Sequence, residues 1–348
     1  MQWDIFCRVI DNHGDAGVCW RLAADLAARG EAVRLWIDDA SALAWMAPQG
    51  AAGVTVARWP DMPVPVEPAQ VVIEAFGCEL PTWFVQRMAA AEPAPAWVNL
   101  EYLSAEDYVE RSHGLQSPQA NGLRKRFYYP GFTPSTGGLI RETDLSARQQ
   151  RFDARTWLAD RGLSTTPGER AVSLFCYRQP GLPALLDVLS RRPTQLLVTP
   201  GHAADQVSAL LGAGLRRGAL RATFLPALTQ REYDELLWAC DLNIVRGEDS
   251  FVRAQWAGQP FLWQIYPQHD AAHLIKLDAF LNRFTGGAAP ELTAFLRQVF
   301  TAWNKDATAF PALQDLAAWQ QHCMVWRDRL LAQTDLSSQL LRFVAESR

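Results

Sequence analysis

The chain has 348 residues, 49% of them apolar, and its 33 basic residues nearly balance its 37 acidic residues to give a formal charge of −4. This length exceeds the size at which one hydrophobic core usually stops growing, so two domains are expected. The sequence has no basic run that could follow a phosphate backbone, no apolar stretch long enough to span a membrane and no N-terminal signal peptide, which argues against nucleic acid and membrane partners and favours a cytoplasmic protein.

Six cysteines are scattered without the spacing of a metal site or a redox pair: Cys7, Cys19, Cys78, Cys176, Cys240 and Cys323. Most lie within apolar segments, so we expect buried, reduced thiols. His269 and His273 stand four residues apart, a spacing that suits a metal, but no third ligand completes a helical zinc motif. We therefore expect no metal site.

The first half alternates between strand and helix patterns. An apolar strand at 3–10 leads into a glycine-containing loop and a helix that ends at Gly30. Further strands are predicted at 32–38, 54–57, 71–75 and 97–100, with a helix-like segment at 40–46. This alternation is typical of a parallel sheet covered by helices. Residues 101–142, rich in Gly, Pro, Ser and aromatic residues with little periodicity, predict a long functional loop.

The second half repeats the alternation. The patterns predict a helix at 147–161, a helix after Gly181, a helix at 231–240 and a helix that opens near Ser250. They also predict strands, at 171–177, 195–200, 222–225, 241–246 and 260–266, and helices over the remainder. The fold class is therefore α/β, with two Rossmann-like domains of parallel sheets facing each other across a cleft, at 1–150 and 151–315, followed by C-terminal helices at 316–348.

The loop DNHGDAG places Asp11 and Asp15 at the carboxyl end of the first strand, where doubly wound sheets bind ligands. Gly14 and Gly17 allow a tight backbone there, but their spacing differs from a dinucleotide fingerprint, and paired carboxylates would repel a pyrophosphate. The loop suits a cationic or hydroxylic acceptor instead. The alternative is that both aspartates only form an Asx turn and a helix N-cap.

A second loop, RGEDS at 246–250, also follows a strand and opens a helix. The free N–H groups and positive end of that helix favour a diphosphate. The Ser250 hydroxyl could add a hydrogen bond to it, and the Arg246 guanidinium could add paired, charge-assisted hydrogen bonds. The alternative is that Glu248 and Asp249 only stabilise the helix dipole while Arg246 pairs with them at the surface.

Two tyrosines and a glutamine suit a nucleotide base. Tyr177 ends a strand and Tyr233 starts a helix, so either ring could stack on a base whose edge Gln230 would read, although packing is the alternative role for each. The sequence lacks the GxSxG elbow and the Walker lysine loop, which argues against the common hydrolases and P-loop ATPases.

Four long segments resemble the elongation factor P arginine rhamnosyltransferase family, EarP: WDIFCRVIDNHGDAGVCWRLAADLA, VNLEYLSAEDYVE, FYYPGFTPSTGGLIRE and NIVRGEDSFVRAQWAGQPFLWQIYPQ. The resemblance spans both halves. It implies a GT-B fold with the protein acceptor on the N-terminal side and the donor on the C-terminal side, and final helices that pack back toward the N-terminal domain. It also implies inverting, metal-independent transfer of L-rhamnose from the co-substrate dTDP-β-L-rhamnose, with no cofactor, to an arginine of elongation factor P.

The resemblance also implies roles for residues. Asp11 and Asp15 become acceptor-side carboxylates, and Glu248 is the third catalytic residue. Ala227 stands where the family has an aromatic residue beside the base. The residues that match the donor site are Asn12, Gly14, Ala16, Gly17, Tyr177, Gln230, Tyr233, Arg246, Gly247, Glu248, Asp249, Ser250 and Tyr266.

The chemistry agrees with this assignment, because a guanidinium is a poor nucleophile until it is held and loses a proton. One aspartate would orient it and the other would accept its proton. Closure about a hinge near residue 150 would bring donor and acceptor together. Two alternatives remain: a GT-B enzyme with another acceptor, and a non-catalytic module that binds a nucleotide sugar or a translation factor.

Overall fold

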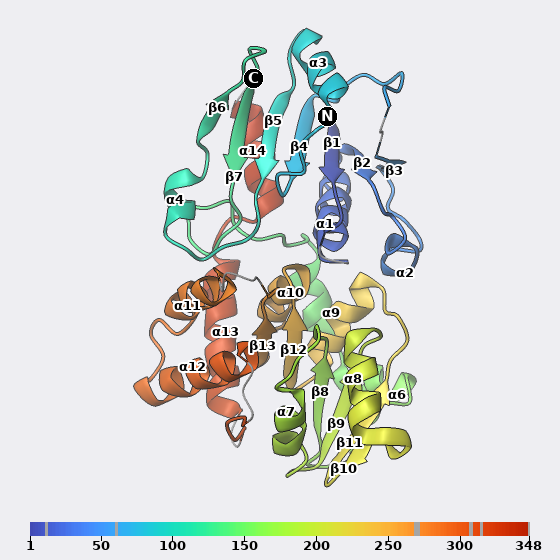
Figure 1. Ribbon diagram of the computed structural model, residues 1–348, viewed down its shortest axis with the longest axis vertical. Coiled ribbons are helices and arrows are strands. Elements are labelled where there is room, and N and C mark those ends of the chain that lie inside the picture. The colour runs from blue at the N-terminus through green and yellow to red at the C-terminus, as the bar shows by residue number, and fades with distance from the viewer. Residues whose placement is uncertain (11–12, 60–61, 268–271, 306–308, 314–315, 347–348) are drawn as a thin grey trace. The chain divides into compact units, whose positions relative to one another are not determined.

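The computed structural model describes residues 1–10, 13–59, 62–267, 272–305, 309–313 and 316–346 (Figure 1). The chain divides into two units. Unit 1 comprises Met1–Leu145 together with Ala332–Arg348, and unit 2 comprises Ser146–Leu331. Each unit is an α/β structure built around one sheet.

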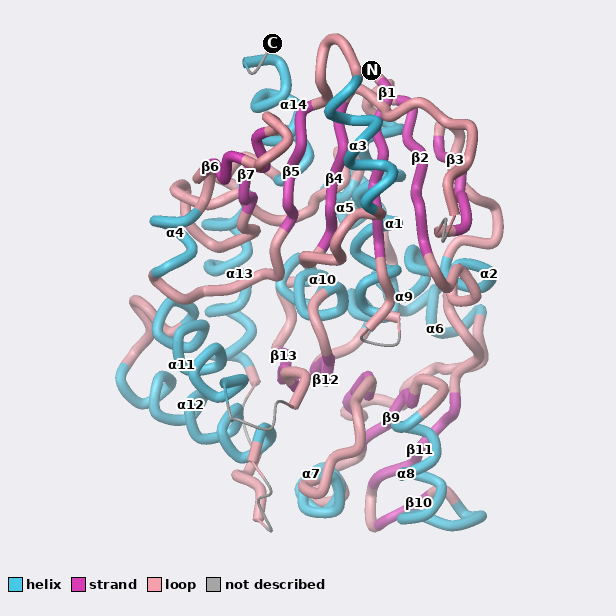
Figure 2. The backbone as a smooth tube through the Cα atoms, turned by 45° about the horizontal axis from the view of Figure 1, so that its top comes forward, coloured by secondary structure: helices cyan, strands magenta, loops and turns pink. Residues whose placement is uncertain are grey.

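Unit 1 contains a sheet in the order β3-β2-β1-β4-β5-β7-β6, whose neighbouring strands run parallel except for the β6–β7 pair. Figure 2 shows these strands side by side. The strands are β1 (Gln2–Cys7), β2 (Ala32–Ile37), β3 (Val54–Arg58), β4 (Val71–Ala75), β5 (Ala96–Leu100), β6 (Gln116–Pro118) and β7 (Arg124–Tyr128). The helices are α1 (Gly14–Ala28), α2 (Leu43–Met46), α3 (Thr82–Ala90), α4 (Tyr108–Ser112) and α14 (Leu336–Glu346).

Helices cover both faces of this sheet, so β1 and β4 are buried almost throughout and are largely apolar on both sides. On one face Leu26 of α1 and Leu340 of α14 join a buried cluster with Ile5. On the other face Phe84 of α3 packs with Phe6. Burial on both faces is the reason that these strands read as continuous apolar runs.

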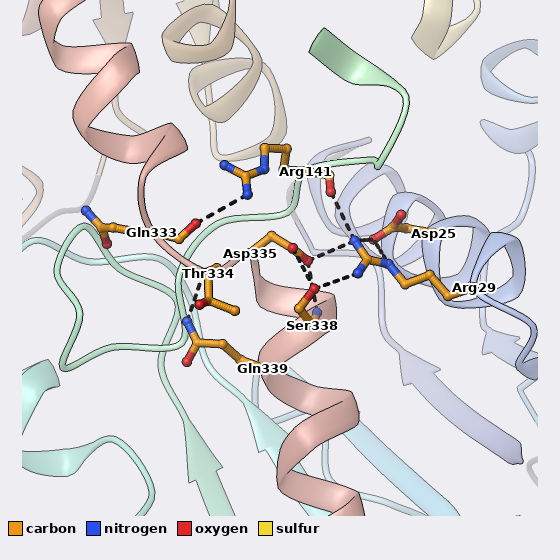
Figure 3. Close-up of polar contacts among 8 residues, drawn as sticks. All are labelled: Asp25, Arg29, Arg141, Gln333, Thr334, Asp335, Ser338 and Gln339. Carbon is orange, nitrogen blue, oxygen red and sulfur yellow. Dashed lines mark hydrogen bonds and ion pairs between the residues drawn. The ribbon is translucent and has the colours of Figure 1, made fainter. Parts of the chain in front are cut away.

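A polar network fastens the C-terminal segment to unit 1 (Figure 3). Arg29, directly after α1, donates to Ser338 Oγ at 2.6 Å, to Asp335 Oδ1 at 2.9 Å and to the Arg141 carbonyl at 3.3 Å. It also pairs with buried Asp25 at 3.0 Å. Burial raises the pKa of Asp25, while the hydrogen bond and charge of Arg29 oppose that rise. The network ties the end of α1 to the start of α14.

Unit 2 contains a sheet in the order β10-β11-β9-β8-β12-β13, parallel except for the β10–β11 pair. The strands are β8 (Arg170–Leu174), β9 (Thr194–Val198), β10 (Arg216–Arg217), β11 (Leu220–Phe224), β12 (Leu242–Arg246) and β13 (Phe261–Gln264). The helices are α5 (Leu145–Arg151), α6 (Ala154–Asp160), α7 (Leu182–Leu189), α8 (His202–Leu211), α9 (Gln230–Ala239), α10 (Asp249–Ala257), α11 (Ala272–Phe284), α12 (Pro290–Asn304) and α13 (Ala317–Leu331).

Two contacts hold α10 in place within unit 2. Phe251 stacks on Trp263 of β13, with ring centroids 3.7 Å apart and planes at 6°. Arg253 makes a paired hydrogen bond to Asp234 of α9, with both distances at 2.8 Å and both side chains only 1% exposed. Removing either ion of a pair buried this deeply would leave the other charge uncompensated and would strongly destabilise the fold.

Several expectations about elements are wrong in detail. The first strand ends at Cys7 and β8 ends at Leu174, each earlier than expected. The long loop at 101–142 contains α4 and the strands β6 and β7. The helix expected at 147–161 breaks into α5 and α6, because Asp153 accepts a hydrogen bond from Arg155 N and caps a new helix. Helix α13 belongs to unit 2, so the segment that returns to unit 1 begins at Ala332.

The cysteine expectation is confirmed, since all six thiols are buried and unpaired. In the part of the chain that the structure describes, no helix is long and apolar enough to cross a membrane. Within the same residues, which include His273 but not His269, no three His, Cys, Asp or Glu side chains lie together as metal ligands.

Candidate active site

The first candidate loop lies at the carboxyl end of β1, where Asp11 and Asn12 fall outside the described residues. Asp15 lies in the first turn of α1 and is 3% exposed. Its Oδ2 accepts a hydrogen bond from Ile10 N at 2.8 Å, and its Oδ1 accepts one from the Tyr102 hydroxyl at 3.4 Å. The carboxylate is therefore held from both sides in one orientation.

Asp15 is not the N-cap of α1, because His13 occupies that position and makes no side-chain cap. Of its neighbours, Ala16 and Gly17 are buried, and Gly14 is half-buried. Ala16 packs into the core of unit 1, so its methyl group is directed away from solvent. The first turn thus presents a fixed carboxylate on a closely packed backbone.

Tyr102 follows β5, and sequence reasoning did not single it out. Its ring stacks on Phe76, with centroids 4.4 Å apart and planes at 13°. Phe76 follows β4 and has a φ of 58°, a left-handed conformation that non-glycine residues rarely adopt. Such a conformation costs roughly 1–3 kcal/mol and persists only where surrounding contacts enforce it. The segment EYLSAEDYVE, which contains Tyr102, resembles the family, but it has no periodicity that would have singled out this residue.

A second acidic group lies beside Tyr102. Burial raises the pKa of Glu101, with a further rise from the negative charge of Glu74, while a hydrogen bond from Asn99 Nδ2 at 2.6 Å opposes both. The ring of Tyr108 meets that of Tyr129 edge to face at 5.8 Å. Burial raises the pKa of both hydroxyls, and Glu101 adds to each rise, so both tyrosines stay protonated at neutral pH.

The second candidate loop follows β12 in unit 2 and is fastened to β13. Gly247 has a φ of 62°, its N–H donates to the Gln264 carbonyl at 3.2 Å, and its own carbonyl accepts from Trp263 Nε1 at 2.7 Å. The Ser250 hydroxyl donates to the Arg246 carbonyl and accepts from Arg246 N at 3.1 Å. The Ser250 hydroxyl therefore closes the loop onto the backbone of Arg246.

Arg246 lies among aromatic rings. Its guanidinium carbon is 4.3 Å from the centroid of Phe175 and 4.4 Å from that of Tyr177. Tyr233 meets Phe175 edge to face at 5.8 Å, and Tyr266 meets Tyr177 in the same way at 5.4 Å. Cation–π contacts of this kind hold a guanidinium in one plane. Phe175 was missed because it reads as an ordinary strand residue.

Two groups that neighbour the half-buried Arg246 have raised pKa values. Burial raises the pKa of the Tyr233 hydroxyl, and nearby Ser250 and Arg246 oppose that rise. Burial also raises the pKa of the Cys176 thiol to about 12, against the positive charge of Arg246. Neither group ionises near neutral pH, so the positive charge of Arg246 is not cancelled by them.

Three further predicted donor residues, Glu248, Asp249 and Gln230, lie at the starts of helices in unit 2. Glu248 is the N-cap of α10 and Asp249 is its first-turn acid, and both are half-buried. Gln230 opens α9 directly after a capping box formed by Thr229. Ala227 is exposed, and Phe224, at the end of β11, is an exposed aromatic three residues before it. The structure thus joins Arg246, Ser250, Tyr177, Tyr233 and Tyr266 through contacts.

A model of the elongation factor P rhamnosyltransferase family EarP matches residues 3–345. The chain belongs to this family. Protein-arginine rhamnosyltransferases of Pseudomonas putida and Pseudomonas aeruginosa are 47% and 45% identical to it, each with 99% of both chains aligned. The corresponding protein of Neisseria meningitidis serogroup B is 36% identical over 93% of this chain and 90% of its own length. The family resemblance noted in the sequence is therefore confirmed.

Solved structures confirm the GT-B fold. A structure of EarP-mediated arginine glycosylation of translation elongation factor EF-P aligns with a TM-score of 0.71 and 35% identity, covering 100% of this chain and 99% of that chain. The spinosyn rhamnosyltransferase SpnG complexed with thymidine diphosphate aligns with a TM-score of 0.56 and 16% identity, over 99% of this chain and 100% of that one. The second likeness concerns the fold alone. The family match, the curated relatives and the EarP structure establish the chain as a glycosyltransferase.

Proposed function

We propose that this chain is an inverting protein-arginine rhamnosyltransferase that moves L-rhamnose from dTDP-β-L-rhamnose to an arginine side-chain nitrogen of translation elongation factor P. The observation that carries the proposal is the extent of the family match, which includes both candidate loops. We assign the acceptor carboxylates to unit 1 and the groups that bind the diphosphate and the base to unit 2. Because a translation factor works in the cytoplasm, we place the enzyme there.

The acceptor is proposed to meet the loop with Asp11 and Asp15. A guanidinium stays protonated below about pH 12, so it needs a group that orients it and one that accepts its proton. Asp15 is held by Ile10 N and the Tyr102 hydroxyl, so its carboxylate pays little conformational entropy on binding. Its burial strengthens its attraction to a cation. One aspartate orients the guanidinium through paired hydrogen bonds while the other accepts the proton.

The donor is proposed to bind at the loop that contains Arg246. The flat guanidinium, held between Phe175 and Tyr177, supports a diphosphate together with the N–H groups at the start of α10. Tyr233 and Tyr266 extend the aromatic surface for the base. Gln230 would read the edge of the base, and the family resemblance gives donor roles to Asn12, Gly14, Ala16 and Gly17 of the first loop as well. Glu248, the N-cap of α10, is the proposed third catalytic residue.

The reaction is one displacement. The guanidinium nitrogen forms a bond to the anomeric carbon, while the bond from that carbon to the diphosphate oxygen breaks and its electron pair leaves with dTDP. The proton lost by nitrogen goes to an aspartate. Attack from the face opposite the leaving group inverts the anomeric configuration. Arg246 and the backbone N–H groups stabilise the charge that develops on the diphosphate, so the mechanism uses no metal.

The test is intact-mass analysis of elongation factor P after incubation with this protein and dTDP-rhamnose, followed by peptide mapping. We expect one added deoxyhexose on a single arginine. The Asp15→Asn variant should lose transfer while it still binds dTDP, because the amide can neither accept the proton nor make a charge-assisted pair with the guanidinium. An unchanged acceptor mass, with donor binding intact, would favour another acceptor or a binding module. Full transfer by both Asp11→Asn and Asp15→Asn would contradict the acceptor-side roles.

A further inference from the structure

The loop after β4 is unusually strained for a segment that packs beside a site. Phe76 and Glu79 have φ values of 58° and 50°, and of the described residues Leu215 is the one other non-glycine residue with positive φ. Phe76 N donates to the Leu100 carbonyl at the end of β5. This bond places Phe76 next to the segment that follows β5, where Tyr102 lies. Backbone strain at a residue beside a site is a sign that the position of that residue matters.

The strained residue supports one side chain. The Phe76 ring is half-buried against the core of unit 1 and stacks on Tyr102. Tyr102 itself stays 38% exposed, yet its hydroxyl reaches the buried Asp15 carboxylate. Tyr102 thus contacts the buried Asp15 carboxylate with its hydroxyl and exposes part of its surface to solvent, while Phe76 holds its ring in place.

We propose that Tyr102, supported by Phe76, is an acceptor-site residue that positions Asp15 through its hydroxyl and binds the acceptor guanidinium against its ring. This inference rests on the proposed function. A guanidinium is planar and weakly hydrated, and it stacks on aromatic faces. A cation on the ring of Tyr102 would lie beside a carboxylate that is one hydrogen bond from the tyrosine oxygen. The strained loop then fixes the position and orientation of the Tyr102 ring through the stacked ring of Phe76.

The two parts of the proposal are separated by two variants. Tyr102→Phe keeps the ring and removes the hydroxyl, so kcat should fall about tenfold through loss of one hydrogen bond to a charged group, with KM for the acceptor unchanged. Tyr102→Leu also removes the ring, so KM for the acceptor should rise by about fivefold in addition. Affinity for dTDP and the melting temperature should stay at wild-type values in both variants.

Tyr108→Phe is the matched control, because Tyr108 also lies in unit 1, is similarly exposed at 41%, and its ring meets that of Tyr129. It should keep wild-type kcat and KM. The assay is elongation factor P rhamnosylation followed by mass spectrometry at varied acceptor concentration.

Wild-type protein is measured first. If it transfers no sugar, the proposed function fails and this inference fails with it. If it transfers sugar but Tyr102→Phe keeps wild-type kcat, or Tyr102→Leu keeps wild-type KM for the acceptor, only the inference is overturned. Loss of dTDP binding or an early melting transition in Tyr102→Phe would mean that the residue is structural, which also overturns it.

Discussion

Replacement of Arg246 by Lys tests whether the donor site depends on the shape of its cation or only on its charge. Arg246 lies 4.3 Å from the Phe175 centroid and 4.4 Å from the Tyr177 centroid. Lysine keeps the positive charge but has no planar group to lie on these rings. If the rings hold the guanidinium ready for a diphosphate, Arg246→Lys should bind dTDP more weakly.

The magnitude follows from the two ring contacts. Each cation–π contact at a partly exposed position is worth about 0.5–1 kcal/mol, so the pair contributes about 1–2 kcal/mol. Since about 1.4 kcal/mol is tenfold in affinity, the dissociation constant for dTDP should rise by about five- to thirtyfold. Phe175→Leu removes one ring and should give about half of this free-energy change.

Isothermal titration calorimetry with dTDP measures the effect. Arg191→Lys is the matched control, because Arg191 is exposed beyond the end of α7 and should bind dTDP as the wild type does. The salt dependence of Arg246→Lys should match that of the wild type, since the charge is kept. A dissociation constant within about twofold of the wild-type value would refute the stacking argument.

Three further predictions concern stability. In urea unfolding, Gly138→Ala should destabilise unit 1 by about 2 kcal/mol or more, because φ at Gly138 is 71° and the added methyl group would lie 2.5 Å from a backbone oxygen of the C-terminal segment. Gly122→Ala is the control: φ is 85° and the space around it is open, so this variant should show the conformational penalty alone. Arg253→Met should lower the unfolding free energy by about 3 kcal/mol, because the buried Asp234 carboxylate loses its paired hydrogen bonds to Arg253 and keeps the longer contact to Arg148 at 3.9 Å. Adding Asp234→Leu should restore most of that loss, and a loss below about 1 kcal/mol in the single variant would contradict the argument. The ion pair with Arg221 lowers the pKa of Glu169 from 4.5 to about 2, so the stabilisation that it provides is present above pH 4.5 and is lost as the pH falls toward 2. At neutral pH, wild type should be more stable to unfolding than Glu169→Gln by about 1 kcal/mol, and this difference should shrink between pH 4.5 and pH 2. A difference that stays constant with pH would contradict the prediction.

The sequence predicts most of the elements because their signals are local. Apolar runs mark β1 and β4, and glycine after a strand marks each of the two candidate loops. The strand β7 was missed because it lies near the edge of the sheet and reads RKRFY, with a single buried residue, Tyr128. The break at Asp153 was missed because helical periodicity continues across it, while the cap depends on one side chain.

The return of the C-terminal segment to unit 1 could not be read from its own residues. Helical periodicity runs through both α13 and α14, but only α14 packs on the sheet of unit 1. The decisive contacts are those of Arg29 with Asp335 and Ser338, more than 300 residues away in the chain. Pairings over such separations depend on the complete fold, since neither segment specifies the other.

The two loops share one construction, which explains why the sequence finds half of each site. In each, a side chain in the first turn of a helix bonds back to the preceding loop backbone: Asp15 to Ile10 N, and Ser250 to the backbone of Arg246. These contacts span four or five residues, so they leave a motif. The aromatic partners, Tyr102 and Phe175, follow other strands of the two sheets, β5 and β8, and leave no such motif. If Tyr102 holds Asp15 in position and Phe175 holds Arg246 in position, variants of Tyr102 and Phe175 should impair transfer without unfolding either unit.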